Sequence, residues 1–281
     1  EPSPPPVDWQ VMIGQMLMVG FRGLTLAEAP FVIEDIRARH LGGVVLFDYD
    51  VPQQRAGRNV ISPEQIRALT TELQAGAEVP LLIATDQEGG QVARLNPACG
   101  FPETLSHTAL GQTGDVAVTY QQAGAIASTL VAAGVNLNLA PVVDLCANPD
   151  NPVIAAYERC FSADPLQVAA HAQSFIQAHR EQGVLCTLKH FPGHGSSTQD
   201  SHHGWVDVTA TWSEDELLPY RQLIAAGQVD AVMTAHVFNA TFDDTYPATL
   251  SSAMLTGLLR EELGYQGVII SDDMQMDAIA Q

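Results

Sequence analysis

The chain has little positive charge. Its 281 residues contain 12 Lys and Arg against 32 Asp and Glu, which gives a formal net charge of −20 and a pI of about 4.5. A surface of this charge repels nucleic acid and anionic membranes, so we expect neither as a partner. Charged residues make up only 16% of the sequence and hydrophobic residues 46%, which excludes a disordered chain and leaves ample material for a core.

Several sequence signals are also absent. No apolar run approaches the roughly 20 residues that a membrane span needs. No G-x-G-x-x-G motif marks a dinucleotide-binding fold, and no C-x-x-C spacing supports a zinc or thioredoxin-type site. We therefore expect no cofactor and no bound metal.

The sequence has only four cysteines, Cys99, Cys146, Cys160 and Cys186. Cys186 lies in an apolar, strand-like run, where a buried free thiol is expected. Cys146 and Cys160 flank a polar segment at 148–152, and two interpretations stay open. A disulfide would close this loop in an oxidising compartment, whereas the alternative, which we prefer from the sequence, is two unrelated small residues.

The first residues, Glu1 to Pro6, are rich in proline and lack both an initiator Met and an apolar, signal-like region. This segment is either the mature start of an exported or lipid-anchored protein or a domain boundary. We expect residues 1–7 to be a leader or linker, residues 8–281 to form one domain, and the protein to be extracytoplasmic.

Short apolar runs alternate with longer helical patterns along the chain. Strands are predicted at 43–47, 81–85, 135–139, 184–188, 231–235 and 268–271. Helices are predicted at 63–77, 115–133, 164–182, 213–226 and 252–263. The repeated order of helix, glycine and buried strand is typical of βα units that build a parallel sheet.

Polar residues follow each predicted strand, at Asp48, Asp86, Asp144, Lys189, His190, His236 and Asp272. In an α/β barrel of the TIM type, (β/α)8, the strand ends form the active-site face, so this architecture is favoured over an open doubly wound sheet. Six βα units are visible, and a full barrel needs two more after Asp272. We therefore expect the domain to be incomplete at its carboxyl end. Residues 9–19 are predicted to be helical and to cover the bottom of the barrel.

The densest group of reactive side chains lies between Lys189 and His203, with one Lys, four His and one Asp in a glycine-rich loop. A structural loop rarely concentrates so many titratable groups, so this loop is a candidate site. His190 and His194 have a spacing that would suit a metal on a helix, but Pro192 lies between them and a regular helix is not expected. Metal binding is the less favoured interpretation.

Three further elements carry acidic residues. Asp200 stands two residues before His202, where a carboxylate fixes the tautomer of an imidazole and raises its basicity. Asp86 ends a buried strand and is a candidate for binding sugar hydroxyls, whereas Glu88 in the same segment would brace the loop. Asp272 and Asp273 also end an apolar strand, and they offer either a nucleophile or a helix cap.

The motif K-H-F-P-G-H-G at 189–195, followed by D-S-H at 200–202, resembles that of family 3 glycoside hydrolases. D-Q-E-G-G at 86–90 is typical of the same family, and the resemblance extends from Trp9 to Gln281. It is strongest to the bacterial N-acetylglucosaminidases that act on peptidoglycan fragments. The resemblance implies a retaining β-N-acetylhexosaminidase that removes terminal β-linked N-acetylglucosamine through a covalent glycosyl-enzyme.

The resemblance also implies a role for individual residues. Asp272 matches the nucleophile, His202 the acid/base, and Asp200 the carboxylate that orients it. Sugar-binding positions of the family fall on Asp86, Arg94, Arg159, Lys189 and His190. Two positions depart from the family pattern, since Cys160 stands where relatives usually have Ser and Gln91 where Arg is frequent. His194 is expected to brace the loop.

Other functions stay open at this stage. A family 3 β-glucosidase, a phosphorylase that uses phosphate in place of water, a metal-dependent hydrolase and a catalytically silent sugar-binding domain are the alternatives. The aglycone is also open between a muropeptide, a chitin oligomer and a glycolipid. We expect a carbohydrate substrate and a monomer.

Overall fold

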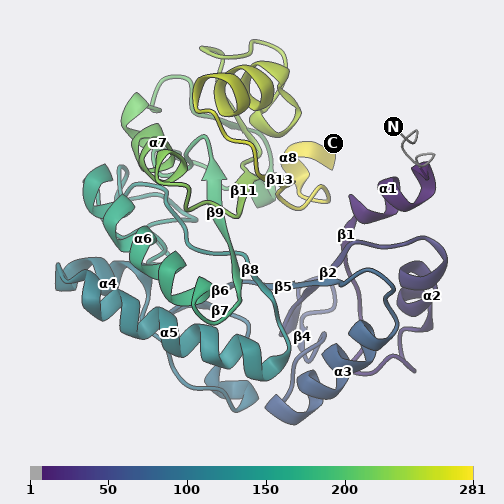
Figure 1. The fold of residues 1–281 in the computed structure, drawn as a ribbon. Helices are drawn as coiled ribbons and strands as arrows, with labels where there is room; N and C mark the ends of the chain where they lie inside the picture. Colours follow the sequence, from purple (N-terminus) through teal and green to yellow (C-terminus); the bar gives the residue numbers. More distant parts are fainter. Residues whose placement is uncertain (1–7, 281) are drawn as a thin grey trace, which may run out of the picture. The chain divides into compact units, whose positions relative to one another are not determined.

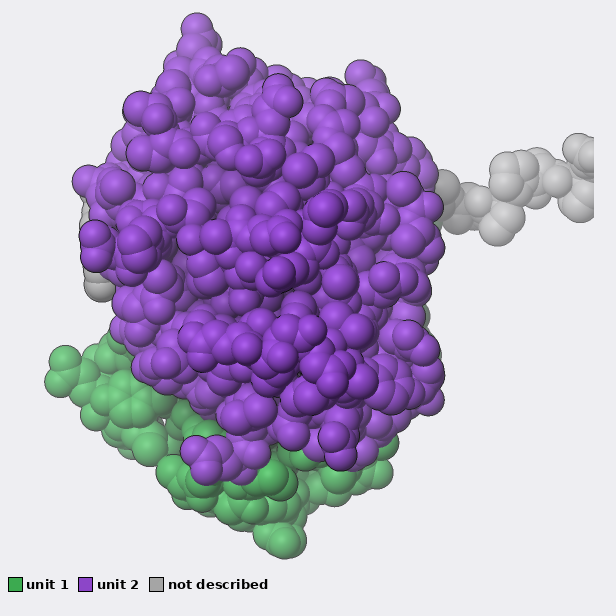
Figure 2. Space-filling model, turned by 90° about the vertical axis from the view of Figure 1, so that its left-hand side faces the viewer, with its two compact units in different colours: residues 1–86, 94–102, 129–137 green, residues 87–93, 103–128, 138–281 purple. Residues whose placement is uncertain are grey.

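The computed structural model describes residues 8–280, and its chain divides into two compact units (Figure 2). The described part of unit 1 comprises residues 8–86, 94–102 and 129–137, and that of unit 2 comprises 87–93, 103–128 and 138–280. The leader predicted at residues 1–7 lies outside the described residues. Within residues 8–280, no helix combines the length and the apolar character that crossing a membrane requires.

Unit 1 is built on three parallel strands that pair in chain order, β1 with β2 and β2 with β5 (Figure 1). Its elements are α1 (Trp9–Gln15), β1 (Met18–Gly20), α2 (Pro30–Ala38), β2 (Gly43–Leu46), β3 (Tyr49–Asp50), β4 (Arg55–Ala56), α3 (Pro63–Ala75), β5 (Leu82–Thr85) and η1 (Pro97–Cys99). Ser62 caps α3 by accepting the backbone N–H of Gln65, and Pro63 occupies the first helical position, as the sequence predicts.

Unit 2 carries the parallel strands β9 (Leu185–Phe191), β11 (Ala231–Thr234) and β13 (Val268–Ser271), again paired in chain order. Its helical segments are α4 (His107–Thr113), α6 (Pro165–Arg180), η2 (Ser201–His203), η3 (Glu214–Leu217), α7 (Leu218–Ala225), η4 (Ala248–Leu250), the π-helical segment η5 (Ala253–Glu262) and α8 (Asp277–Ala280). Its short strands are β6 (Gln87–Gly89), β7 (Val92–Ala93), β10 (Val206–Asp207) and β12 (Val237–Phe238). Helix α5 (Val116–Ala133) and strand β8 (Leu137–Asn138) each have residues in both units.

Strands β9 and β11 have the burial expected of a sheet covered on both faces, whereas β13 is partly exposed. Every residue of β11 is buried, as is every residue of β9 after Leu185. Helix α6 packs against β9 and α7, and it buries an apolar stripe that includes Val168, Phe175 and Ile176. Because these strands are fixed along their length, the residues that follow them have defined positions.

The structure corrects the sequence prediction at the amino terminus. Residues 9–19 were predicted to form one helix, but α1 ends at Gln15 and Met18 begins a seventh parallel strand, β1. The apolar residues of this segment run on almost without interruption, so periodicity cannot separate the helix from the strand. The parallel sheet therefore has seven strands in place of the six predicted, and the pairing in chain order is that of a partial TIM-type barrel.

Candidate active site

Strand β9 ends in the side chains that the sequence analysis singled out. Lys189 and His190 are its fifth and sixth residues, and both are buried, with 2% and 5% of their surface exposed. The peptide bonds Lys189–His190 and Phe191–Pro192 are both cis. The glycine-rich loop that follows leads to Asp200 and His202.

A buried carboxylate, Glu88, lies at the centre of the cationic side chains. Arg159 donates to it from Nε and Nη2, at 2.8 Å each, and the Nζ atom of Lys189 lies 2.7 Å from Glu88 Oε1. Burial alone raises the pKa of Glu88, but the charges of Arg159 and Lys189 outweigh it and hold this pKa far below its usual range. Glu88 is therefore ionised, and it fixes the two cations side by side.

The position of Glu88 is set by the backbone hydrogen bonds of Gln87, the residue that precedes it in β6. Asn138 accepts the backbone N–H of Gln87 at 3.0 Å and donates to the carbonyl of the same residue at 3.0 Å. These two hydrogen bonds fix the backbone of β6 next to Asn138, and the backbone of Glu88 therefore has a defined position.

His190 lies between Asp144 and Arg159. Its Nδ1 atom is 2.6 Å from Asp144 Oδ2, and its Nε2 atom is 3.2 Å from Arg159 Nη2. Because a guanidinium can only donate, Nε2 accepts, and the proton on Nδ1 is donated to Asp144. Burial raises the pKa of Asp144, yet the adjacent His190 and His194 leave it below its usual range, so Asp144 is a charged acceptor.

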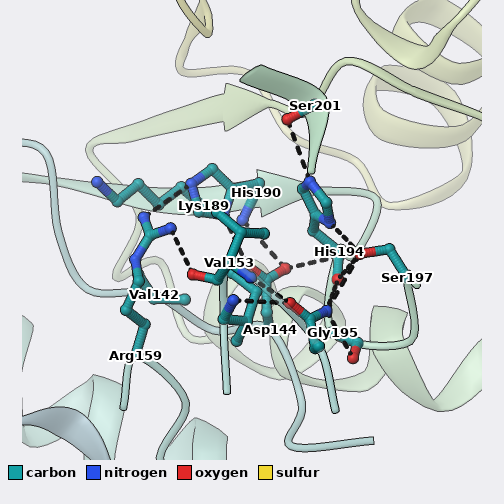
Figure 3. A network of polar contacts seen from close by, with 12 residues as sticks. Val142, Asp144, Val153, Arg159, Lys189, His190, His194, Gly195, Ser197 and Ser201 are labelled. Atoms are coloured by element: carbon teal, nitrogen blue, oxygen red, sulfur yellow. Dashed lines mark hydrogen bonds and ion pairs between the residues drawn. The ribbon is translucent and has the colours of Figure 1, made fainter. Parts of the chain in front are cut away.

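Two buried carboxylates bind the backbone of the loop that follows. Asp144 Oδ1 accepts the N–H of His194 at 2.8 Å, and Glu216 Oε2 accepts the N–H of Gly195 at 3.0 Å. Figure 3 shows Asp144 bonded to both His190 and His194. Side chains of two separate segments therefore fix the backbone of this loop.

His194 links this loop to the next helical turn. Its Nδ1 atom lies 2.6 Å from the hydroxyl of Ser197, and its Nε2 atom lies 3.2 Å from the hydroxyl of Ser201 (Figure 3). Burial lowers the pKa of His194 to about 4, so the imidazole is neutral at pH 7. The prediction that His194 braces the loop is confirmed.

Asp200 and His202 form a pair on η2. Asp200 Oδ1 lies 2.6 Å from His202 Nδ1 and also accepts the backbone N–H of His202 at 2.9 Å. The side chain of His202 is 55% exposed. The carboxylate therefore fixes a proton on Nδ1 and leaves Nε2 for proton exchange with a bound group.

Asp272 directly follows β13. Its backbone N–H donates to the carbonyl of Thr234 at 3.2 Å. The imidazole of His236 donates from Nε2 to the carbonyl of Asp273 at 3.0 Å, and its Nδ1 atom lies 2.8 Å from the hydroxyl oxygen of Thr249. Within residues 8–280, no hydrogen bond joins Asp272 to His202.

Asp86 and Arg94 belong to unit 1. Arg94 Nη2 lies 3.5 Å from Asp86 Oδ2, and Arg94 Nη1 lies 3.8 Å from Asp48 Oδ1. The guanidinium also lies over the ring of Phe47, 5.8 Å from its centroid. The structure therefore places these two predicted sugar-binding residues in contact with each other.

Four residues of the site had no assigned role in the sequence analysis beyond their place near a strand end or in a predicted helix. Glu88 was expected only to brace its loop, Asp144 and His236 were noted as strand-end residues, and Glu216 was part of a predicted helix. Glu88 and Asp144 each contact predicted site residues. Glu216 binds the backbone of the loop after β9, and His236 binds the backbone beside Asp272. A charged residue directly after a buried strand was the available signal for Asp144 and His236, whereas local sequence gave none for Glu216.

The preference for unpaired thiols at 146 and 160 is wrong. Cys146 and Cys160 form a disulfide, with their Cα atoms 5.4 Å apart. Cys186 is a buried free thiol, as predicted, and Cys99 is also free. The two chain segments joined by the disulfide are those that carry Asp144 and Arg159.

Comparison with known proteins agrees with this arrangement. The family described as "Glycosyl hydrolase family 3 N terminal domain" matches residues 9–281. Beta-hexosaminidase A of Pseudoalteromonas piscicida is 35% identical over 314 residues, which cover 98% of this chain and 50% of that protein. The beta-hexosaminidase of Tolumonas auensis is 38% identical over 258 residues, which cover 88% of this chain and 71% of that protein.

A solved structure shows the same fold. The glycoside hydrolase family 3 β-N-acetylglucosaminidase from Paenibacillus sp. str. FPU-7 superposes with a TM-score of 0.88 at 40% identity, covering 98% of this chain and 51% of that one. The chain thus spans about half the length of the Pseudoalteromonas and Paenibacillus proteins.

Parallel strands paired in chain order, with carboxylates and imidazoles at their ends, define a barrel domain of the glycoside hydrolase type. The chain belongs to glycosyl hydrolase family 3, and residues 9–281 are its N-terminal domain.

Proposed function

We propose that this domain carries the catalytic centre of a retaining β-N-acetylhexosaminidase, which removes terminal β-linked N-acetylglucosamine from peptidoglycan-derived or chitin-like oligosaccharides. The observation that carries the proposal is the Asp200–His202 pair, with Nδ1 and Oδ1 2.6 Å apart. Its loop begins at the end of β9, next to the buried cluster of Glu88, Arg159 and Lys189.

In the first step Asp272 attacks the anomeric carbon, and the bond from that carbon to the glycosidic oxygen breaks. His202, protonated on both nitrogens, gives its Nε2 proton to the departing oxygen, while Asp200 stabilises the imidazolium through Nδ1. The product is a glycosyl ester of Asp272 and a free alcohol.

In the second step the roles reverse. Neutral His202 takes a proton from water at Nε2, and the water oxygen attacks the anomeric carbon and displaces Asp272. Two carboxylates placed together raise each other's pKa, so an imidazole as the acid/base keeps the nucleophile ionised. Retention of configuration follows from the two displacements.

The sugar would be held by the polar groups of Arg159, Lys189 and His190. Their positions are fixed before substrate binds, because Glu88 and Asp144 are buried acceptors that bind them. Asp86 and Arg94 are proposed as further sugar-binding residues on the family pattern. Fixed donors that cost no reorganisation favour a defined orientation of the ring.

The decisive test is to trap the intermediate in the full-length protein. A slow fluorinated N-acetylglucosaminide should leave one sugar on the peptide that holds Asp272, as seen by mass spectrometry after proteolysis. Asp272→Ala should abolish both the adduct and turnover. An adduct on another residue, or turnover near the wild-type rate in Asp272→Ala, would refute the assigned nucleophile.

Assays on the same full-length protein distinguish the competing functions. Aryl N-acetylglucosaminide should be cleaved faster than aryl glucoside, and added phosphate should leave N-acetylglucosamine as the product. Faster glucoside cleavage indicates a β-glucosidase, a sugar 1-phosphate indicates a phosphorylase, and loss of activity on chelation indicates a metal-dependent hydrolase. Sugar binding with no turnover indicates a silent domain.

A further inference from the structure

The Cys146–Cys160 disulfide closes a segment that has no regular structure of its own. Residues 147–159 contain turns but no helix and no strand. The two Cα atoms are 5.4 Å apart although 14 positions separate the cysteines in sequence. The disulfide therefore holds the two ends of this segment close to each other.

Each cysteine stands beside a residue that binds His190. Asp144 lies two positions before Cys146, and Arg159 directly precedes Cys160. Asp144 Oδ2 contacts one nitrogen of the imidazole at 2.6 Å, and Arg159 Nη2 contacts the other at 3.2 Å. The disulfide thus closes a ring that passes from Asp144 through the imidazole to Arg159 and returns through the two sulfur atoms.

Non-covalent contacts also hold this ring, and the side chain of Asn151 within it makes several buried hydrogen bonds. The N–H of Cys146 donates to the carbonyl of Ser162 at 2.9 Å, and the hydroxyl of Thr108 donates to the carbonyl of Cys160 at 2.8 Å. Glu158 has a φ of +55°, a left-handed conformation that costs a non-glycine residue about 1 kcal/mol. The cysteines also pack in a small apolar cluster with Val142, Val153 and Ile154.

We infer that the disulfide is a positioning element of the sugar-binding site, because it holds Arg159 and Asp144 at the separation that fixes His190. This inference rests on the proposed function. A dithiol reductant opens the bond by supplying two electrons and two protons, which yields two cysteine thiols and the oxidised dithiol. The segment that carries Arg159 is then held only by non-covalent contacts, including the buried ion pair of Arg159 with Glu88.

The disulfide is linked more directly to the groups that hold the sugar than to those that break the bond. Asp200 and His202 bind each other on η2, and Asp272 follows β13. The ring reaches η2 through the loop at 194–197, which Asn151 binds and which His194 joins to Ser201. Opening the disulfide should therefore raise KM and weaken the binding of free N-acetylglucosamine, with little change in kcat. A displacement of the donors by a fraction of an ångström corresponds to about a five- to tenfold effect.

The test compares oxidised full-length protein, dithiothreitol-treated protein with its thiols blocked, and Cys146→Ser/Cys160→Ser. Cys99→Ser is the matched control, because Cys99 is a free cysteine outside the ring. Each form is assayed for kcat and KM with aryl N-acetylglucosaminide and for the Kd of N-acetylglucosamine, below its thermal midpoint. Thiol titration counts the open disulfides.

The expected result is a raised KM and Kd in both forms without the disulfide, wild-type values in Cys99→Ser, and recovery when the dithiol-treated but unblocked protein is reoxidised. Unchanged KM and Kd with the disulfide shown to be open overturns the inference. So does a fall in kcat alone, or a loss of thermal stability without a change in binding. If the oxidised protein neither binds nor cleaves the sugar, the proposed function has failed independently of the disulfide.

Discussion

The guanidinium of Arg159 makes two hydrogen bonds to Glu88, from Nε and Nη2, each 2.8 Å long. Both side chains are almost fully buried, and Lys189 contacts the same carboxylate. The carboxylate of Glu88 therefore lies between two cations in an environment of low dielectric constant. Such an arrangement is stable only while all its members are present.

Removing the carboxylate should therefore be costly. Glu88→Ala leaves Arg159 and Lys189 buried beside each other without their counter-ion, and we expect a loss of about 3–5 kcal/mol in the free energy of unfolding. Urea denaturation measures this loss. The exposed pair Arg221–Glu262 supplies the control, because Glu262→Ala should cost about 0–1 kcal/mol. Equal losses in the two variants would contradict the role assigned to Glu88.

Asp200 should matter for chemistry more than for binding. Asp200→Asn keeps the shape of the side chain but removes the charge that stabilises the imidazolium of His202, so kcat should fall by about 100- to 1000-fold. KM should change little, because the sugar-binding donors lie on other residues. Steady-state kinetics with an aryl N-acetylglucosaminide give both constants. The exposed loop residue Asp150 provides the control, since Asp150→Asn should leave kcat unaltered.

Glu216 should make stability depend on pH. Burial, together with the nearby charge of Asp144, raises the pKa of Glu216 to about 7, despite hydrogen bonds from Gly195 and Ser196 that lower it. Because its folded-state pKa lies above the ordinary value of 4.5, the stabilisation is fully present below pH 4.5 and is lost as pH rises through 7. The total corresponds to about 3 kcal/mol.

The variant Glu216→Gln isolates this contribution, because the other titrating groups are common to both proteins. Relative to the variant, the wild type should lose stability as the pH rises from 4.5 towards 7, and the loss should level off above this pKa. Chemical denaturation at each pH gives the difference. A difference in the free energy of unfolding between the two proteins that does not change with pH would contradict the raised pKa of Glu216.

Gly193 should not tolerate a side chain. Its φ is +127°, and a Cβ atom built there would lie 2.5 Å from Glu216 Oε2. Gly193→Ala should therefore cost about 3 kcal/mol, from the backbone conformation and the overlap together. Gly257 is the matched control, because it lies in η5 with open space around it. Gly257→Ala should be neutral or stabilising by up to about 1 kcal/mol, and thermal denaturation compares the two.

The βα units could be predicted from the sequence because both of their signals are local, namely a glycine after each helix and an apolar run in each strand. Helix α5 ends before Gly134, whose φ is +76°, and α6 ends shortly before Gly183, whose φ is also +76°. These left-handed glycines mark the helix ends in the sequence itself. Strand β1 escaped prediction because three residues after an apolar helix carry no period of their own.

The site was predicted only in part, for a related physical reason. Asp200 and His202 are two residues apart, so their contact could be inferred from the sequence. Glu88 and Arg159 are 71 residues apart, and their hydrogen bonds exist only because the sheet brings distant segments together. Glu216 and Gly195, 21 residues apart, gave no local signal. The disulfide had been considered from the sequence but not preferred, because spacing alone does not fix how two thiols approach each other.

The burial of Lys189 has a practical consequence for chemical labelling. It is the only lysine in the sequence, and its side chain is 2% exposed and bound to Glu88. An amine-directed acylating reagent therefore finds no accessible lysine while the site is intact. Acylation of Lys189 requires the cluster to open, so the rate at which this residue is modified, followed by mass spectrometry, reports local opening of the site against a background free of other lysines.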